Sequence, residues 1–362
     1  MKRKLCKEKQ YLKNHAKSMM KRRLQFKAKR RAKRKSYIGV KNTARKRLQI
    51  MDRFRDYVKI TVPKVFSFTQ NPNPSIKFMS KVEDALEHNR KVFIDMENVE
   101  VILDGALVVL LSSMIKFKSK KIDFNGNFPR NAESNATLLG SGFFEQLYRP
   151  RSIKQQDRYS INFPNKKGER IFTHAHKIVD SKLSSQIISE VSKFIWGESR
   201  RCPGLQRTYI ELMQNTNNHA ANNNKGVHHW WTTISYNENE NKACFAFIDY
   251  GIGIINSIRN DSSSKFNKVF KSIVELFNPK NEADILHLLL DGKMHSSTGQ
   301  YYRGKGLPGI CNTCKDNKIS NLVVITNKAM AKVSEMEYIT LGNNFPGTFV
   351  YWELTNNNSS II

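Results

Sequence analysis

The sequence predicts a protein of mixed α/β class, in which two α/β domains follow a strongly basic N-terminal arm. Three observations lead to this prediction. Basic side chains are concentrated in the first 50 of the 362 residues, strand-like and helix-like segments alternate from residue 57 onward, and a polar stretch separates two such alternating regions. We expect the arm at residues 1–55, the first domain at 56–150, a linker at 151–175, the second domain at 176–356 and a tail at 357–362.

Charge, hydropathy and cysteine content exclude several classes of protein. The formal net charge is +30, and residues 1–50 hold 13 Lys and 8 Arg against the single acid Glu8. The longest nearly apolar stretch, from Gly105 to Ile115, is too short to span a bilayer, and no apolar run follows the charged N-terminus as it would in a secretory signal. Five cysteines in a chain of this length do not indicate a disulfide framework. We therefore expect a cytoplasmic protein that does not insert into membranes.

The arm carries its charge in three clusters, which are Lys21-Arg22-Arg23, Lys29-Arg30-Arg31 and Lys33-Arg34-Lys35. Apolar residues recur every seven positions, at Leu5, Leu12, Met19 and Phe26, and would form a narrow stripe along a helix. Repulsion between like charges opposes that helix, so we expect the arm to be disordered or frayed alone and to order on a polyanion. We favour DNA or RNA as that polyanion. A membrane surface and a solvated targeting tail are the alternatives.

The first domain is predicted from alternating strand and helix patterns that imply a small sheet with helices packed on it. Strands are expected at residues 57–62, 91–96 and 121–124. Helices are expected at 75–87, 104–116 and 132–140, with a turn at 71–74 before the first of them.

Residues 92–147 resemble a STAS domain, the small module of anti-sigma-factor antagonists. The resemblance rests on the order of three motifs, FIDMENVEVILDGALVVLL, KIDFNGNFP and GSGFFEQL. Antagonists of this family carry a phosphorylatable serine just before the glycine, whereas here that segment is Ile102-Leu103-Asp104. We therefore do not expect regulated phosphorylation at that place. The resemblance implies a docking or packing module that could recruit a protein partner.

The C-terminal half contains four separated motifs that favour a nucleotide site. The first is ELMQNTNNHA, in which Glu211 and Asn215 are one helical turn apart and can handle a water and a hard cation together. The second is DYGIG, in which Asp249 follows a predicted strand and two glycines allow a flat ligand to approach the chain closely. Each motif alone also occurs in ordinary turns.

The third motif is RGKGLPGI, where glycines before a predicted helix expose backbone N–H groups to phosphate and Lys305 adds a charge. The fourth is Gly347-Thr348-Phe349, at the start of the predicted final strand over 348–354. The segment between the second and third motifs, residues 256–303, includes predicted helices at 269–277 and 282–290.

In this order and spacing the four motifs resemble the Bergerat-fold (GHKL) ATPases, the group that contains gyrase and the histidine kinases. The likeness covers residues 176–356, and the first motif is most similar to that of the anti-sigma serine kinases. The resemblance implies an α+β two-layer sandwich that binds ATP with Mg²⁺, and an ATP lid between the second and third motifs. It implies Mg²⁺ binding by Asn215, general-base action by Glu211, adenine binding by Asp249 with Thr348, close approach at Gly251 and Gly253, and phosphate binding by Gly304, Lys305, Gly306 and Leu307. His219 could contact a phosphate or serve as a structural hydrogen-bonding residue.

Three functions are compatible with these features. The first is an ATPase that associates with nucleic acid and closes its lid or forms a homodimer when nucleotide binds. The second is a non-enzymatic, ATP-gated scaffold whose STAS-like domain recruits a partner. The third is a protein serine/threonine kinase of the anti-sigma type that acts in trans.

Overall fold

The fold is taken from a computed structural model, which describes residues 54–359 except 104, 149–169, 177–178, 220–228, 260–273 and 294–305, together with residues 19, 20, 22, 25–27 and 29. Side chains of residues 170–176, 217–219 and 229 are not described. The chain divides into two units, residues 1–56 and 57–362. In the first unit, Arg22 and Lys29 are helical and exposed, as are Met19 and Phe26, and the other basic cluster residues lie outside the described part.

The larger unit begins with an α/β region over residues 57–148, which we call the N-terminal region. Its elements are β1 (Val58–Thr61), β2 (Val65–Phe66), α3 (Pro72–Glu87), β3 (Val92–Asp95), β4 (Val101–Ile102), α4 (Ala106–Ser119), β5 (Phe124–Gly126), α5 (Ala132–Gly140) and α6 (Phe143–Tyr148). A parallel sheet has the order β1-β3-β5, and β2 pairs with β4 in a second parallel ladder. The expected alternation of strands and helices is therefore present.

The rest of the larger unit, residues 170–359, is built on a five-stranded antiparallel sheet of order β6-β7-β8-β10-β9, and we call it the C-terminal region. The strands are β6 (Arg170–His176), β7 (His229–Asn237), β8 (Lys242–Asp249), β9 (Ser320–Lys332) and β10 (Glu337–Thr355), with the 3-10 helix η4 (Val333–Glu335) before β10. The helices are α7 (Ser181–Trp196), α8 (Pro203–His219), α9 (Ile254–Arg259), α11 (Glu282–Leu290) and α12 (Gly306–Lys315). Mixed α/β class, with both parallel and antiparallel sheets, is confirmed.

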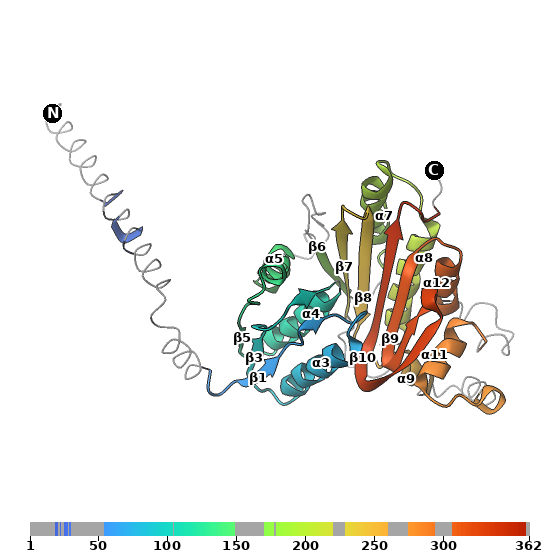
Figure 1. Cartoon of the computed structure of the whole chain (residues 1–362), viewed down its shortest axis with the longest axis horizontal. Helices are drawn as coiled ribbons and strands as arrows, with labels where there is room; N and C mark the ends of the chain where they lie inside the picture. The colour runs from blue at the N-terminus through green and yellow to red at the C-terminus, as the bar shows by residue number, and fades with distance from the viewer. Residues whose placement is uncertain are drawn as a thin grey trace, which may run out of the picture. The chain divides into compact units, whose positions relative to one another are not determined.

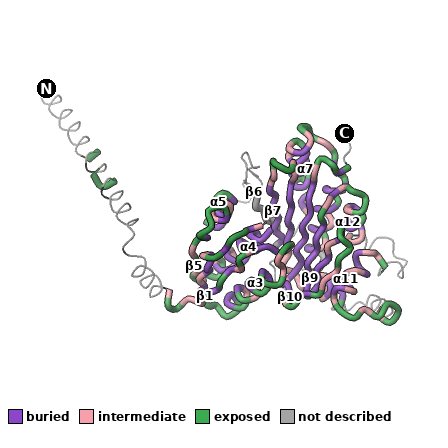
Figure 2. Tube along the Cα trace, in the orientation of Figure 1, coloured by how far each residue is buried: buried purple, intermediate pink, exposed green. Residues whose placement is uncertain are grey.

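The five-stranded sheet is covered on both faces, with α3 and α4 on one side and α7, α8, α11 and α12 on the other (Figure 1). Consecutive residues of β8 therefore enter two different cores, because side chains alternate along a strand. Cys244 and Ala246 pack in the core shared with α3 and α4, whereas Phe245 and Phe247 pack under α7 and α8. The central strands are accordingly buried along their length (Figure 2).

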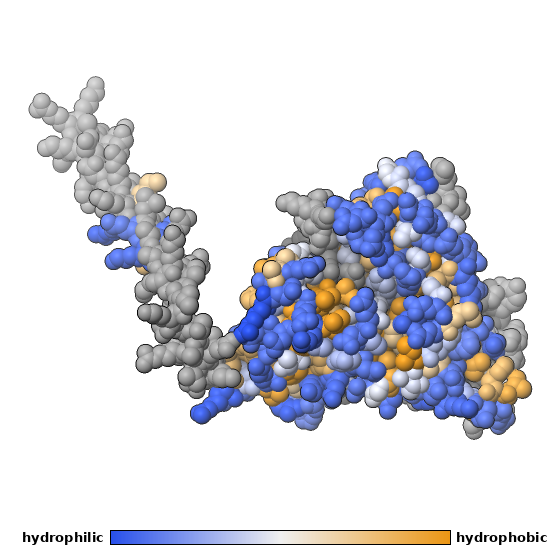
Figure 3. All heavy atoms as spheres, viewed as in Figure 1, coloured by the Kyte–Doolittle hydropathy of each residue, from blue (hydrophilic) through white to orange (hydrophobic). Residues whose placement is uncertain are grey.

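Helix α4 is buried on nearly all sides, which explains its almost uninterrupted apolar sequence. Every residue from Ala106 to Met114 is buried. Hydrophobic residues gather around this helix in an otherwise largely hydrophilic surface (Figure 3). The N-terminal region and the face of the large sheet beneath it thus share one continuous hydrophobic core.

Several element boundaries differ from the prediction. Helix α3 begins at Pro72 and absorbs most of the predicted turn, because proline is well tolerated in the first helical turn, where its missing N–H has no partner to lose. The third strand begins at Phe124, since Lys121 adopts a left-handed conformation just after α4. Residues 170–176 form the strand β6, although they were assigned to a linker up to residue 175. Asn358, assigned to a tail, is buried and donates to the carbonyl oxygen of Asn317.

No helix among the described residues combines the length and the apolar character that crossing a membrane requires.

Candidate functional site

Three polar side chains form a row across the end of the large sheet, on the face covered by α7, α8, α11 and α12. Asp249 ends β8 and stands opposite Thr348 of β10, and Thr348 in turn stands opposite Thr326 of β9. The alternation along each strand places all three on the face of Phe247, Val350 and Val324, which belong to the core under α7 and α8. Asp249 of the DYGIG motif and Thr348 of the GTF motif, which are 99 residues apart in sequence, are therefore direct neighbours across two paired strands.

Asp249 is an incompletely satisfied carboxylate. Its Oδ1 accepts a hydrogen bond from the N–H of Gly251 at 2.8 Å, and Thr348 donates a second one. Among the described residues it has no ion-pair partner. Burial raises the pKa of Asp249 to about 6, and these two hydrogen bonds oppose that rise. A carboxylate in this state has acceptor capacity left for a ligand that donates a hydrogen bond.

Glycines surround Asp249 where no side chain would fit. Gly347 has a φ of +112°, and a Cβ there would collide with the carbonyl oxygen of Asp249. Gly253 has a φ of +81°, and its Cβ would lie 2.5 Å from the side-chain oxygen of Asn327. A Cβ at Gly251 would lie 3.0 Å from Oδ1 of Asp249. The glycines of the DYGIG and GTF motifs thus let three chain segments approach one another closely.

Two residues that the sequence analysis missed hold these segments together. The buried Asn327 accepts from the N–H of Ile255 at 3.1 Å and donates to the carbonyl oxygen of Ile252 at 3.0 Å, which fixes the DYGIG loop and the start of α9. Thr326 accepts from the N–H of Ile254 at 2.8 Å and donates to the carbonyl oxygen of Gly347 at 3.2 Å. Their only sequence signal is a polar Thr-Asn pair inside an apolar strand.

Helix α8 presents Glu211 and Asn215 to the first residue of α12. A Cβ on Gly306 would lie 2.8 Å from Oε2 of Glu211 and 3.5 Å from Oδ1 of Asn215. Glu211 keeps 23% of its side chain exposed, and Asn215 is partly exposed. The expected pairing of the two side chains on one helix face is therefore present, and both lie beside the first turn of α12, where backbone N–H groups have no partner within the helix.

Arg207, one turn before Glu211, is a further residue that the sequence analysis missed. Its Nε lies 4.0 Å from Oε1 of Glu211. Its guanidinium lies so close to Gly309 that a side chain at that position would collide with it. A cation beside the first turn of a helix is unfavourable unless an anion lies nearby, since the helix start carries partial positive charge. Glu211 provides one such anion.

Some predicted site residues are only partly placed. Gly304 and Lys305 lie outside the described residues, and only the backbone of His219 is described, within α8. Leu307 lies in the first turn of α12 and packs against the core. Among the described residues, no three His, Cys, Asp or Glu side chains gather as a metal site. Glu211 and Asn215 remain the two side-chain oxygen donors next to the α12 start.

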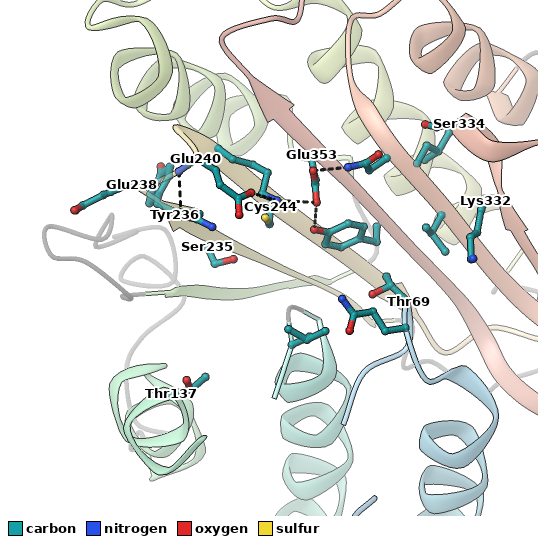
Figure 4. Close-up of a pocket in the computed structure, with 18 of the residues that line it drawn as sticks. Thr69, Thr137, Ser235, Tyr236, Glu238, Glu240, Cys244, Lys332, Ser334 and Glu353 are labelled. Carbon is teal, nitrogen blue, oxygen red and sulfur yellow. Dashed lines mark hydrogen bonds and ion pairs between the residues drawn. The ribbon is translucent and has the colours of Figure 1, made fainter. Parts of the chain in front are cut away.

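A large cavity of about 1070 Å³ lies on the other face of the sheet, between its strands and the N-terminal region (Figure 4). Glu353, Tyr351 and Cys244 line its sheet wall, and Thr137 of α5 lines the opposite wall. Glu353 is buried and accepts hydrogen bonds from Tyr351 at 2.6 Å and Asn321 at 2.7 Å. Among the described residues that line this cavity, none is a predicted nucleotide residue.

None of the known protein-family models matches this chain, and no curated protein matches it.

Proposed function

We propose that the protein binds ATP through a Bergerat-type site on the face of the large sheet covered by α7, α8, α11 and α12, and hydrolyses it with Mg²⁺. The observation that carries the proposal is the row formed by Asp249, Thr348 and Thr326, with glycines on both sides of Asp249. The N-terminal region would then be a STAS-like docking module. The resemblance of the four motifs supports this proposal, and so does their pairing in the structure, because DYGIG lies against GTF while Glu211 and Asn215 lie against Gly306.

The surroundings of Asp249 fit an adenine base. The exocyclic amino group of adenine donates hydrogen bonds, and Asp249 is a half-buried carboxylate with acceptor capacity to spare. Gly251 leaves the space beside this carboxylate free of a side chain. With a pKa of about 6, Asp249 is mostly ionised at neutral pH and is then a strong acceptor.

The α12 start and the α8 side chains fit the triphosphate. The backbone N–H groups from Gly306 onward, together with Lys305, are groups that bind phosphate. Asn215 would hold Mg²⁺ through its side-chain oxygen. When bound, Mg²⁺ neutralises phosphate charge. Glu211 lies beside Gly306, where it can accept a proton from an attacking water, and Arg207 lies within reach to orient its carboxylate.

The basic arm at residues 1–55 would bind nucleic acid. Twenty of the 30 excess positive charges lie in residues 1–50, a density that favours DNA or RNA over a protein surface. Nucleotide-dependent lid closure or homodimer formation would couple the two activities. An ATP-gated scaffold and a protein kinase acting in trans remain the second and third candidates, because each uses the same site.

The proposed ATPase activity is tested by Mg²⁺-dependent ATP hydrolysis with wild type, Glu211→Gln and a matched control, Glu190→Gln, which alters an exposed acid on α7. We expect Glu211→Gln to lower turnover at least a hundredfold while ATP still binds, and Glu190→Gln to leave it unchanged. ATP binding without turnover in wild type would favour the scaffold. Transfer of labelled phosphate to a protein would favour the kinase.

The nucleic-acid association is tested by binding of duplex DNA and RNA to the full chain and to a variant lacking residues 1–55. We expect affinity for duplex DNA to fall with log salt at a slope of about −0.9 per phosphate contacted, and deletion of the arm to abolish this dependence. Polyanion affinity that survives deletion with its salt dependence intact would contradict the assignment to the arm.

A further inference from the structure

The tyrosine inside the DYGIG motif points away from the row of polar side chains. Asp249 lies on the face of the sheet covered by α7, α8, α11 and α12, and Tyr250, the next residue, packs against the core shared with the N-terminal region on the other face. A single loop thus has one side chain in the candidate nucleotide site and the next among residues 140 positions earlier in the chain. Such a loop can be positioned from the opposite face of the sheet.

Helix α4 binds Tyr250 through three contacts. The Tyr250 hydroxyl donates to the carbonyl oxygen of Val109 at 3.0 Å and forms a short hydrogen bond with the hydroxyl of Ser112. The Nζ of Lys116 lies 3.5 Å from the centroid of the Tyr250 ring. Burial raises the pKa of Tyr250, so the hydroxyl stays protonated and able to donate at any working pH.

These contacts are tied to a second helix of the N-terminal region. Glu83 of α3 accepts from the hydroxyl of Ser113 at 2.6 Å and pairs with the Nζ of Lys116 at 3.4 Å. Lys116 is therefore held between the carboxylate of Glu83 and the Tyr250 ring. This arrangement fixes the cation over the ring by more than one interaction, as a stable cation–π contact requires.

The start of α4 also contacts β10, the strand that pairs with β8. Gly105 has a φ of +81° and packs against β10 so closely that a Cβ would lie 2.7 Å from the ring of Phe349 and 2.9 Å from the Cβ of Ala246. Phe349 follows Thr348 directly, as Tyr250 follows Asp249. One helix therefore contacts, from the opposite face, the residues next to both members of the Asp249–Thr348 pair.

We propose that α4 of the N-terminal region positions the Asp249–Thr348 pair for base recognition, with Tyr250 as the positioning residue. The inference rests on the proposed nucleotide site and adds to it that the N-terminal region, which supplies none of the four motifs, determines the preference of that site for adenine. The N-terminal region then acts on the nucleotide site through the sheet, without contributing a ligand contact.

The test compares Tyr250→Phe with Tyr351→Phe in the full chain. Tyr351 is a matched control because its hydroxyl is also hydrogen-bonded, on the same sheet face, to Glu353. The dissociation constants of ATP and of inosine triphosphate, which lacks the amino group that Asp249 would bind, are measured by titration calorimetry. We expect Tyr250→Phe to weaken ATP binding about tenfold, the effect of one lost buried hydrogen bond at the upper end of its range. Inosine triphosphate binding should hardly change.

If Tyr250→Phe lost the same affinity for both nucleotides, its role would be merely structural and the proposal would be overturned. Unchanged affinity for both nucleotides would overturn it as well. Hydrogen exchange without nucleotide gives an independent measurement. The peptide that contains Gly251 should exchange faster in Tyr250→Phe and in Ser112→Ala, and no faster in Tyr351→Phe. Unchanged exchange would contradict the positioning role. If wild type bound no nucleotide but this exchange pattern held, the proposed function would fail while the positioning by α4 stood.

Discussion

Two aspartates end central strands in the two regions of the larger unit, and their surroundings are opposite. Asp95 ends β3, and its carboxylate binds the Nζ of Lys59 at 2.8 Å and the Nδ2 of Asn127 at 2.6 Å. Asp249 ends β8 and is held by Gly251 and Thr348, with no cation beside it among the described residues. An aspartate at the end of a central strand thus has a cation and a side-chain amide as partners in the N-terminal region. In the C-terminal region its counterpart has only hydrogen bonds from the neighbouring Gly251 and Thr348 among the described residues.

The pKa values of the two carboxyls follow this difference. For Asp95, burial favours the neutral form, but the bonds from Lys59 and Asn127 outweigh it and lower the pKa below its usual value. For Asp249, burial prevails and raises the pKa to about 6. The comparison predicts that the Asp95 carboxylate stabilises the fold, whereas the Asp249 carboxylate lowers its stability and keeps acceptor capacity.

The largest expected effect comes from the glycine that lets β10 approach Asp249. Gly347→Ala should lower the free energy of unfolding by about 4 kcal/mol, because the new Cβ would collide with the carbonyl oxygen of Asp249 and φ is positive. Gly197→Ala is the control, since Gly197 has a φ of +77° but open space around it, and should cost about 1 kcal/mol. Urea denaturation measures both values. Equal losses would mean that the close approach at Gly347 contributes nothing.

Neutralising the two aspartates should change the free energy of unfolding in opposite directions. Asp249→Asn should raise the free energy of unfolding by about 2 kcal/mol at pH 7.5, since a partly desolvated charge is removed while hydrogen bonding is kept. A folded pKa raised to about 6 means that this gain is full above pH 6 and fades as the pH falls toward 4. Asp95→Asn should lower stability by about 2 kcal/mol at pH 7.5, because charged hydrogen bonds are lost.

The contribution of Asp95 to the free energy of unfolding depends on pH in the opposite way to that of Asp249. Its pKa is lowered in the fold, so the stabilisation is present above the unfolded value near 4 and is lost as the pH falls through the folded pKa. Denaturation curves between pH 3.5 and 7.5 test both signs. A destabilised Asp249→Asn at pH 7.5 would show that this carboxylate is structural, and the contrast between the two regions would fail.

The hydroxyl of Thr326 should contribute more than an ordinary buried hydroxyl. Thr326→Val leaves the N–H of Ile254 and the carbonyl oxygen of Gly347 without this partner and should cost about 1.5 kcal/mol. Thr313→Val is the matched control, because its hydroxyl donates only to the Gly309 carbonyl one turn earlier in α12. Urea denaturation should show a clearly smaller loss for Thr313→Val, and a similar loss would contradict the bridging role of Thr326.

The smallest expected effect is the pH dependence of ATP affinity. If ionised Asp249 accepts from adenine, a pKa of about 6 makes binding about tenfold weaker at pH 5 than at pH 7. Inosine triphosphate, which lacks the amino donor, should change much less over the same range. Calorimetric titration with both nucleotides measures the difference, and identical pH profiles would argue against base recognition by Asp249.

Much of the candidate site could be predicted because its residues lie in recognisable local sequence patterns. Asp249 stands between an apolar strand and two glycines, and Glu211 and Asn215 have the spacing of one helical turn. The strand run of β8 and the helix α11 also have the predicted positions, since their apolar patterns are long and uninterrupted. Local patterns suffice where the chemistry and the periodicity lie in one segment.

The rest depends on contacts between distant segments. Thr326 and Asn327 lie in a strand whose apolar pattern conceals their bonds to residues more than 70 positions earlier. Tyr250 resembles any loop tyrosine until α4 is seen beside it. Strand β6 was missed because an edge strand needs little apolar sequence when only one neighbour, β7, fixes its register.

The most direct test of the central claim is the binding of Mg²⁺-ATP to wild type and to Asp249→Asn at pH 7.5, measured by calorimetry together with the denaturation curves of both proteins. The account predicts that wild type binds ATP and that the variant binds it at least a hundredfold more weakly, although the variant is the more stable protein. Equal ATP binding by the two proteins, or no ATP binding by a folded wild type, would contradict it.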